Sequence, residues 1–403
     1  MLVRRMLKLV LIAACFAPAW WAADFRTANV DPAAAGMNAA RIARIPKRMQ
    51  EFVDAGKAAG IVTLVARHGH VALLSAVGYQ DLESRAPMRT DTIFRIMSMT
   101  KPMTGTAVMM LVDEGRLAVI DPVEKYLPEF RGQKMKVKCA ENGQTDCLAA
   151  PPRPITILDV LAHVSGIQEP ATGARTLAEA VAAYAKAPLE FEPGSRWRYR
   201  TSGINTAGRV VEVVSGRPYD QFLSDHLFTP LGMRDTTFAP TSAQRSRVAT
   251  LYTYRDGRLQ RTPDSSIRPS EPFPEPGAGA YSTAEDLARF YQMVLDQGTF
   301  NGKRLLSAPA VQFMTSVLTG NLEAGFAPGQ GYGLGWGITR ELKGSFRLSS
   351  VGSFGHGGAY RTYGWIDPAK DMFCILLMQR TNEGGDIADE INAFLAMAAA
   401  AIE

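Results

Sequence analysis

Residues 92–101 read Thr-Ile-Phe-Arg-Ile-Met-Ser-Met-Thr-Lys. The first five, residues 92–96, are typical of a short strand or extended segment, and they lead directly to Ser98. Residues 99–114 are largely apolar and predict a helix. Pro102 falls in the first turn of that helix, where the missing N–H of proline costs little. The sequence therefore predicts a strand that runs into Ser98 and a helix that starts beside it.

Ser98 and Lys101 are one helical turn apart, so the helix places both side chains on one face. A helix N-terminus supplies unpaired N–H groups and a positive dipole end. A serine hydroxyl needs a base to become a nucleophile, and burial lowers the pKa of a lysine enough to make it one. The spacing is equally compatible with a helix-capping serine and a solvated lysine. The apolar helix, which would bury Lys101, favours a catalytic pair.

The composition is that of a globular protein. Of 403 residues, 46% are hydrophobic and 21% charged, and the length suggests two or three domain-sized units. Residues 1–23 begin with Arg4, Arg5 and Lys8 and continue with a short apolar run and small residues, which predicts a secretory signal peptide. Loss of these three cations takes the formal charge from +5 to +2. No cluster of Lys and Arg remains, so we expect no nucleic-acid partner.

The export segment leaves two alternatives open. A signal peptidase would cut after Ala19, by the small-x-small rule, or after Ala23. Alternatively, Cys15 and its apolar neighbours resemble a bacterial lipoprotein signal, in which Cys15 carries a lipid anchor. The apolar run is too short to span a membrane comfortably. We expect an exported protein, periplasmic or secreted, with no transmembrane span in the mature chain.

The other cysteines fit export. Cys139 and Cys147 lie eight positions apart in a polar segment, which predicts a local disulfide in an oxidising compartment. Cys374 lies in an apolar run and is expected in the core. No cysteine or histidine spacing suggests a metal site, and we expect no cofactor.

Strand patterns occur at both ends of the chain and helical patterns between them. Residues 38–57 predict a helix, and residues 61–66 and 71–77 predict a hairpin that turns at 67–70. Helical segments follow at 157–162, 176–185, 203–214 and 283–296, then strands at 331–338 and 373–378 and a helix at 387–400. This order predicts an α/β fold of the α+β type: an antiparallel sheet built from both termini and flanked by helices, with an inserted helical domain and the active site between them. In the mature chain, 24–403, we assign about 38–95 and 300–403 to the sheet subdomain and about 96–299 to the helical subdomain.

Around Ser98 and Lys101 the sequence resembles the serine β-lactamases and penicillin-recognising enzymes, whose first motif is Ser-x-x-Lys. The nearest branch comprises class C β-lactamases, DD-peptidases and family VIII carboxylesterases. The second family motif, Tyr-x-Asn, aligns with Tyr199 and Thr201, after a Pro-Gly turn at 193–194. The resemblance implies that Tyr199 is the general base of acylation and the proton donor to the leaving group. A tyrosine needs a cation such as Lys101 nearby to reach the phenolate form.

The third family motif, Lys-Thr-Gly, aligns with His356, Gly357 and Gly358. Two glycines let a substrate approach a strand backbone closely. The resemblance implies a substrate pocket at these residues and Thr201, and an oxyanion hole made by the backbone N–H groups of Ser98 and Ala359. Matches extend from about residue 40 to the end and include the stretches 157–166, 277–283 and 331–338.

Three departures from the family motifs indicate the substrate. Thr201 replaces Asn, His356 replaces Lys, and Gly357 replaces Thr. In the lactamases, the lysine and the threonine hydroxyl hold the carboxylate of the β-lactam antibiotic. A histidine is mostly neutral at pH 7. We therefore predict a carboxylesterase that acts on short-chain esters, with a β-lactamase or D-amino-acid peptidase as the alternative and a catalytically silent binding protein as a third. The expected partner is a small ester or amide.

Two other serine chemistries, the nucleophile elbow and the Ser-His-Asp triad, require different sequence features. No serine here lies in Gly-x-Ser-x-Gly, so the nucleophile elbow of the α/β-hydrolases is absent. A Ser-His-Asp triad through His356 stays open, and it predicts that loss of His356 is as damaging as loss of Lys101.

Overall fold

The computed structural model describes residues 25–139, 147–171, 173–262, 273–343, 348–382 and 389–403. The predicted signal peptide, with Cys15, lies outside these ranges. No helix in the described ranges is long and apolar enough to cross a membrane.

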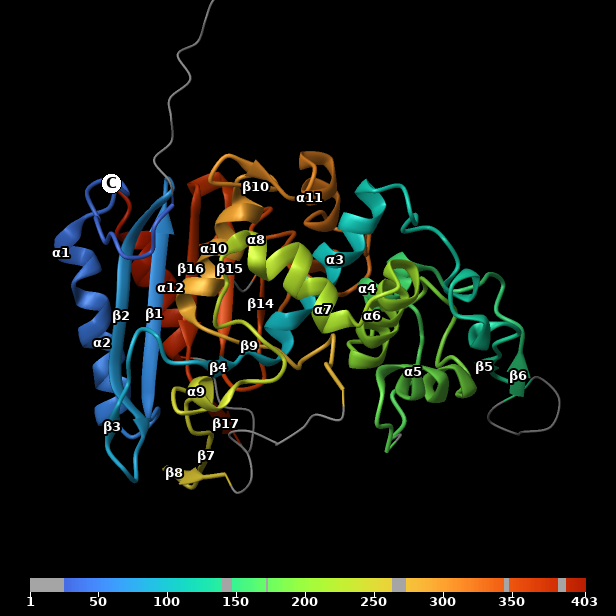
Figure 1. Cartoon of the computed structure of the whole chain (residues 1–403), viewed down its shortest axis with the longest axis horizontal. Helices are drawn as coiled ribbons and strands as arrows, with labels where there is room; N and C mark the ends of the chain where they lie inside the picture. The colour runs from blue at the N-terminus through green and yellow to red at the C-terminus, as the bar shows by residue number, and fades with distance from the viewer. Residues whose placement is uncertain (1–24, 140–146, 172, 263–272, 344–347, 383–388) are drawn as a thin grey trace, which may run out of the picture.

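An eight-stranded antiparallel sheet forms one half of the molecule (Figure 1). Its order is β12-β13-β14-β15-β16-β1-β2-β3, so strands from the end of the chain pair with strands from its beginning. This confirms the predicted sheet built from both termini. The strands are β1 (Gly60–Arg67), β2 (His70–Asp81), β3 (Ala86–Pro87), β12 (Gln330–Tyr332), β13 (Gly337–Thr339), β14 (Phe354–Gly357), β15 (Tyr363–Asp367) and β16 (Met372–Leu377).

Alternation along the central strands divides the core into two layers. In β1, Val62, Leu64 and Ala66 face one cluster, while Ile61 and Val65 face the other. Helices α1, α2 and α12 cover the second cluster, and α10 packs on the opposite face against β1 and β16. The α-helices in the described ranges are α1 (Ala39–Ile42), α2 (Arg44–Asp54), α3 (Lys101–Asp113), α4 (Ile157–Leu161), α5 (Leu177–Lys186), α6 (Thr201–Ser215), α7 (Tyr219–Leu223), α8 (Thr229–Leu231), α9 (Ser242–Arg245), α10 (Ala284–Leu295), α11 (Ala308–Met314) and α12 (Asp389–Ala400).

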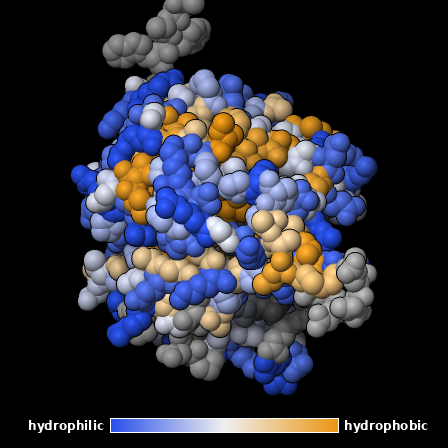
Figure 2. All heavy atoms as spheres, turned by 90° about the vertical axis from the view of Figure 1, so that its right-hand side faces the viewer, coloured by the Kyte–Doolittle hydropathy of each residue, from blue (hydrophilic) through white to orange (hydrophobic). Residues whose placement is uncertain are grey.

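The helical part lies beside the sheet, where α6 packs against α3, α4 and α5. On its outer face, hydrophobic residues form separate patches among hydrophilic ones (Figure 2), as on most folded protein surfaces. Short strands also occur outside the large sheet. One of them, β4 (Phe94–Arg95), lies in the predicted strand or extended segment 92–96 and pairs with β9 (Tyr281–Ser282). The sequence patterns did not indicate β9 or the other short strands, which are β5 (Met135–Val137) with β6 (Cys147–Ala149), β10 (Thr299–Phe300) with β11 (Lys303–Arg304), and β7 (Tyr252–Arg255) with β8 (Arg258–Arg261) and β17 (Arg380–Asn382). The predicted Cys139–Cys147 disulfide is present and joins the ends of β5 and β6. Cys374 is buried, as expected.

One predicted strand, residues 331–338, is instead a hairpin of β12 and β13. The glycines of this stretch explain the difference. Gly335 has a φ of 79°, and a Cβ there would lie 2.5 Å from the backbone oxygen of Lys101. Only glycine allows the turn to pack so closely against the start of α3.

Candidate active site

The chain reaches Ser98 through a tight turn. After β4 the residue Met97 has a φ of 50°, a conformation that costs a non-glycine residue about 1–3 kcal/mol. Ser98 lies in the 3₁₀ turn Met97–Thr100, and α3 begins only at Lys101. The structure thus places Ser98 one turn before the α-helix rather than in its first turn. The Thr100 hydroxyl holds the turn by donating to the Met97 carbonyl at 2.7 Å.

Lys101 is fully buried beneath Ser98. Its Nζ donates to Ser98 Oγ at 3.0 Å and to the carbonyl oxygen of Gly277 at 2.7 Å. Desolvation lowers the pKa of Lys101 to about 7, against the opposing charges of Glu275 and Glu169. An amine that is partly neutral at pH 7 and touches a serine hydroxyl is able to accept its proton.

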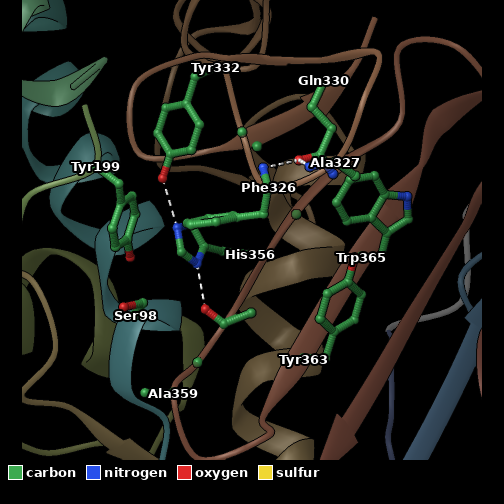
Figure 3. Close-up of a pocket in the computed structure, with 15 residues that line it drawn as sticks. Ser98, Tyr199, Phe326, Ala327, Gln330, Tyr332, His356, Ala359, Tyr363 and Trp365 are labelled. Atoms are coloured by element: carbon green, nitrogen blue, oxygen red, sulfur yellow. Dashed lines mark hydrogen bonds between the residues drawn. The ribbon is translucent and has the colours of Figure 1, made fainter. Parts of the chain in front are cut away.

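Tyr199 completes the group around Ser98. Figure 3 shows its hydroxyl directed at Ser98, and Lys101 Nζ lies 4.7 Å from the centroid of its ring. Burial raises the pKa of Tyr199, and the Ser98 hydroxyl opposes that shift. The phenol is therefore the resting form, and it carries a proton that it is able to donate.

His163 holds Tyr199 from behind. Its carbonyl oxygen accepts the N–H of Arg198 at 2.8 Å, and its Nδ1 accepts the N–H of Arg200 at 3.4 Å, so both neighbours of Tyr199 are bound to one residue. The imidazole lies 4.6 Å from the Tyr199 ring, between centroids. His163 is itself buried, with a φ of 60°. It lies in the stretch 157–166, but no feature of that stretch indicated contact with Tyr199.

His356 is fixed on β14 by two hydrogen bonds. Its Nδ1 lies 2.6 Å from the carbonyl oxygen of Gly357 and its Nε2 lies 2.7 Å from the hydroxyl of Tyr332. A carbonyl only accepts, so Nδ1 carries the proton and Nε2 accepts from Tyr332. Burial and the charge of Lys101 lower the pKa of His356 to about 3. His356 is therefore neutral with both nitrogens occupied, which disfavours a triad through it.

Ser98, Tyr199 and His356 open onto one cavity of about 380 Å³. It is lined by Ser98, Tyr199, Gly325, Phe326, Ala327, Gln330, Tyr332, Gly337, Gly355, His356, Gly357, Gly358, Ala359, Tyr363 and Trp365. Ser98 and Ala359, the expected oxyanion-hole residues, thus face the same space. Thr201 is not among the lining residues. It begins α6, where its N–H donates to the carboxylate of Glu169 at 3.1 Å.

The cavity also contains aromatic residues that the motifs did not indicate, namely Phe326, Tyr332, Tyr363 and Trp365. None of its lining residues, all of which are described, carries an acidic side chain, a lysine or an arginine. In the described ranges, no group of His, Cys, Asp and Glu is arranged to hold a metal ion.

A sheet built from both termini, a helical part beside it, and a buried Ser-Lys pair next to a tyrosine define a serine hydrolase of the β-lactamase fold. The chain belongs to the β-lactamase family, whose profile matches residues 45–398.

Two curated relatives and one solved structure support this assignment. The protein Rv1367c of Mycobacterium tuberculosis is 34% identical over 82% of this chain and 88% of its own length. Esterase EstB of Burkholderia gladioli is 31% identical over 89% of this chain and 95% of its own. The structure of EstCE1, described as a hydrolase with promiscuous acyltransferase activity, superposes with a TM-score of 0.76 at 25% identity, covering 90% of this chain and 99% of EstCE1.

Proposed function

We propose that this protein is a carboxylesterase that forms an acyl-enzyme on Ser98 and hydrolyses short-chain, uncharged esters. One observation carries the proposal: the cavity at Ser98 is lined by neutral groups alone, and His356, at the position where the lactamase motif has a cation, is neutral and fully hydrogen-bonded. A substrate carboxylate would lose its hydration there without gaining a charged partner. An uncharged ester has no such cost, and similarity to EstB supports the same choice.

Acylation begins with the attack of Ser98 Oγ on the ester carbonyl carbon. The Ser98 proton passes to neutral Lys101 Nζ, which lies 3.0 Å away. The backbone N–H groups of Ser98 and Ala359 stabilise the negative oxygen of the tetrahedral intermediate. The bond to the alcohol then breaks, the alcohol oxygen takes the proton of the Tyr199 hydroxyl, and the Lys101 ammonium returns a proton to Tyr199.

Deacylation repeats these steps with water. Water attacks the acyl carbon and gives a proton to Lys101, the bond to Ser98 Oγ breaks, and Oγ recovers a proton from the same relay. The carboxylic acid leaves, and Ser98, Lys101 and Tyr199 return to their starting protonation states. Burial of Lys101 is essential to both halves because it keeps the amine partly neutral at pH 7.

We further propose that the protein acts outside the cytoplasm. Support comes from the Cys139–Cys147 disulfide, a bond that persists in oxidising compartments, and from the basic and apolar pattern of residues 1–23. Fractionation of the native host, with an immunoblot of periplasm, medium and membranes, tests this. A reduced protein found in the cytoplasm would contradict the proposal.

The activity is tested with a panel of p-nitrophenyl butyrate, nitrocefin and a D-alanyl-D-alanine peptide, with Ser98→Ala as the blank. We expect the butyrate ester to give the largest kcat/KM and the Ser98→Ala protein to give none. A larger kcat/KM on nitrocefin or on the peptide would replace the esterase with a lactamase or a peptidase. A wild-type protein that no fluorophosphonate probe labels would indicate a silent binding protein.

A further inference from the structure

The cavity has a second arm, which extends from Ser98 across β14 to Tyr363 and Trp365 on β15. In Figure 3, Ser98 and Tyr199 lie on one side of the β14 backbone, and Tyr363 and Trp365 lie on the other. The catalytic steps use only the first side.

The strand register makes the floor of this arm flat. Gly355 pairs with Trp365, and Gly357 pairs with Tyr363, so each aromatic residue has a glycine opposite it on the same face. A Cβ at Gly355 would lie 2.5 Å from Cε3 of Trp365, and a Cβ at Gly357 would lie 3.2 Å from Cδ2 of Tyr363. The two rings thus occupy the space that side chains would fill at the glycines. They are inclined by only 14°, with centroids 5.9 Å apart.

These rings are supported on one side and open on the other. Both belong to the hydrophobic cluster that α2 and α12 cover, and both line the cavity. Tyr363 is 9% exposed and Trp365 is 8% exposed. A ring pair that the core holds in this way is a rigid apolar surface, suited to a flat apolar group.

Phe326 lies at the mouth of the cavity and is 69% exposed, although its ring touches that of Tyr199 at 4.9 Å between centroids. Its loop is held in place, because the N–H groups of Phe326 and Ala327 donate to Gln330 Oε1 at 2.7 and 3.2 Å. A ligand in the cavity would cover this ring and remove apolar surface from water.

We propose that this arm is an acyl subsite for a flat aromatic ring, so that the preferred substrates are esters of aryl-substituted short acids such as phenylacetic acid. This rests on the proposed esterase function. The leaving alcohol must face Tyr199 to receive its proton, so the acyl group takes the opposite direction, toward Tyr363 and Trp365. Phe326 contacts the substrate at the entrance.

The test compares p-nitrophenyl phenylacetate with p-nitrophenyl cyclohexylacetate, two acyl groups of similar size of which only one is flat. Rates are divided by those of alkaline hydrolysis, which removes differences in intrinsic reactivity. We expect the wild type to favour the phenylacetate in kcat/KM by about tenfold or more, a ratio within reach of one apolar pocket. Equal rates, or faster turnover of the cyclohexyl ester, would overturn the proposal.

Two variants locate the preference. Phe326→Leu and Trp365→Leu keep apolar bulk but remove a flat surface, and each should reduce the ratio to about twofold. Ile120→Ala, at a residue that is 74% exposed and outside the cavity lining, is the control and should keep the wild-type ratio. A ratio unchanged in both leucine variants would also overturn the proposal. Thermal melts identify a variant that fails by unfolding, and Phe326, being exposed, is the safer of the two.

A second pair of esters tests the direction of binding. Benzyl acetate and cyclohexylmethyl acetate place the same two rings on the alcohol, and we expect little difference between them. A preference that appears only in this pair would assign the arm to the alcohol instead. If the wild type hydrolyses no ester at all but is labelled by fluorophosphonate, the esterase proposal is wrong. If it hydrolyses esters without a preference for the flat ring, only the acyl-subsite proposal is wrong.

Discussion

Two walls of one cavity differ in how their polar atoms are hydrogen-bonded. On the wall formed by Ser98 and the start of α3, Ser98 Oγ is hydrogen-bonded to Lys101 Nζ and to the Tyr199 hydroxyl, and the protons of these groups are exchangeable. On the wall formed by β14, the nitrogens of His356 are bound to Tyr332 and to a backbone carbonyl. Proton transfer needs partners that change during the reaction, so the first wall is suited to chemistry.

The second wall is suited to recognition for the same reason. The two nitrogens of His356 are bound inside the protein, and what this wall presents to a substrate is mainly glycine backbone and aromatic rings. The comparison shows that a family motif position, here His356, indicates where a pocket lies without indicating its charge. Substitutions in the two walls should therefore have effects on activity that differ in size and in kind.

The largest effect is expected for the buried amine. Lys101→Met keeps the apolar stem and removes the proton acceptor, so we expect kcat/KM to fall about 10⁴-fold, near the loss in Ser98→Ala, because residues that act as a unit fail together. The melting temperature should stay the same or rise, since a buried amine whose hydrogen bonds go to a hydroxyl and a carbonyl oxygen is replaced by an apolar group. If Lys101→Met loses both its activity and its fold, the loss of activity gives no support to a catalytic role for Lys101.

Tyr199→Phe is expected to be next. It keeps the ring contacts with His163 and Phe326 but removes the proton donor. General acid catalysis contributes about 10²–10⁴-fold, so kcat should fall within that range on p-nitrophenyl butyrate. The loss should be smaller for p-nitrophenyl esters than for ethyl esters, because p-nitrophenolate leaves without a proton. Equal losses on both would indicate that Tyr199 only positions other groups.

The residues of these two predictions are identifiable from short stretches of sequence, and so are some elements of the fold. The outer helices and the β1–β2 hairpin follow from periodicity and from the turn at 67–70. The β7–β8 hairpin was missed, although Asp256 and Gly257, both with positive φ, form a turn of the Asp-Gly type that signals one.

The two cavity walls show which contacts a local sequence pattern predicts and which it does not. Ser98 and Lys101 share a helical turn, so their spacing alone brings them together. Tyr332, by contrast, reaches His356 only because the β12–β13 hairpin pairs with β14, and Trp365 reaches the cavity through its register with Gly355. Such contacts depend on strand pairing across the whole sheet, which no local pattern encodes.

His163 lies between the walls, and its variant should have an intermediate effect. His163→Phe keeps a ring against Tyr199 but loses the Nδ1 acceptor of the Arg200 N–H. We expect kcat on p-nitrophenyl butyrate to fall about tenfold with little change in KM, as for a group displaced from its best geometry. His163→Gln, which offers an amide oxygen, should recover part of the loss. A change confined to the melting temperature would mean that His163 supports the fold and not Tyr199.

A change of pH should act on the catalytic wall alone. Lys101 has a pKa of about 7, so kcat/KM should fall about tenfold for each pH unit below that value and level off above it. Stability should also rise with pH from about 7 to 10.5, because in that window the unfolded chain binds a proton at Lys101 that the folded chain does not. The melting curve of Lys101→Met should lack this dependence. A flat kcat/KM profile from pH 5 to 8 would exclude Lys101 as the base.

The smallest effect is expected at His356. In His356→Gln the amide oxygen replaces Nε2 as acceptor for the Tyr332 hydroxyl, so the wall keeps its shape and its neutrality. We expect kcat/KM on p-nitrophenyl butyrate to fall by no more than about tenfold, the cost of an imperfect hydrogen bond in a packed site. The acid limb should keep its midpoint, because a His356 with a pKa of about 3 does not titrate near neutrality. A loss as large as that of Lys101→Met, or a shifted acid limb, would make His356 a proton carrier and would restore the triad that its two hydrogen bonds disfavour.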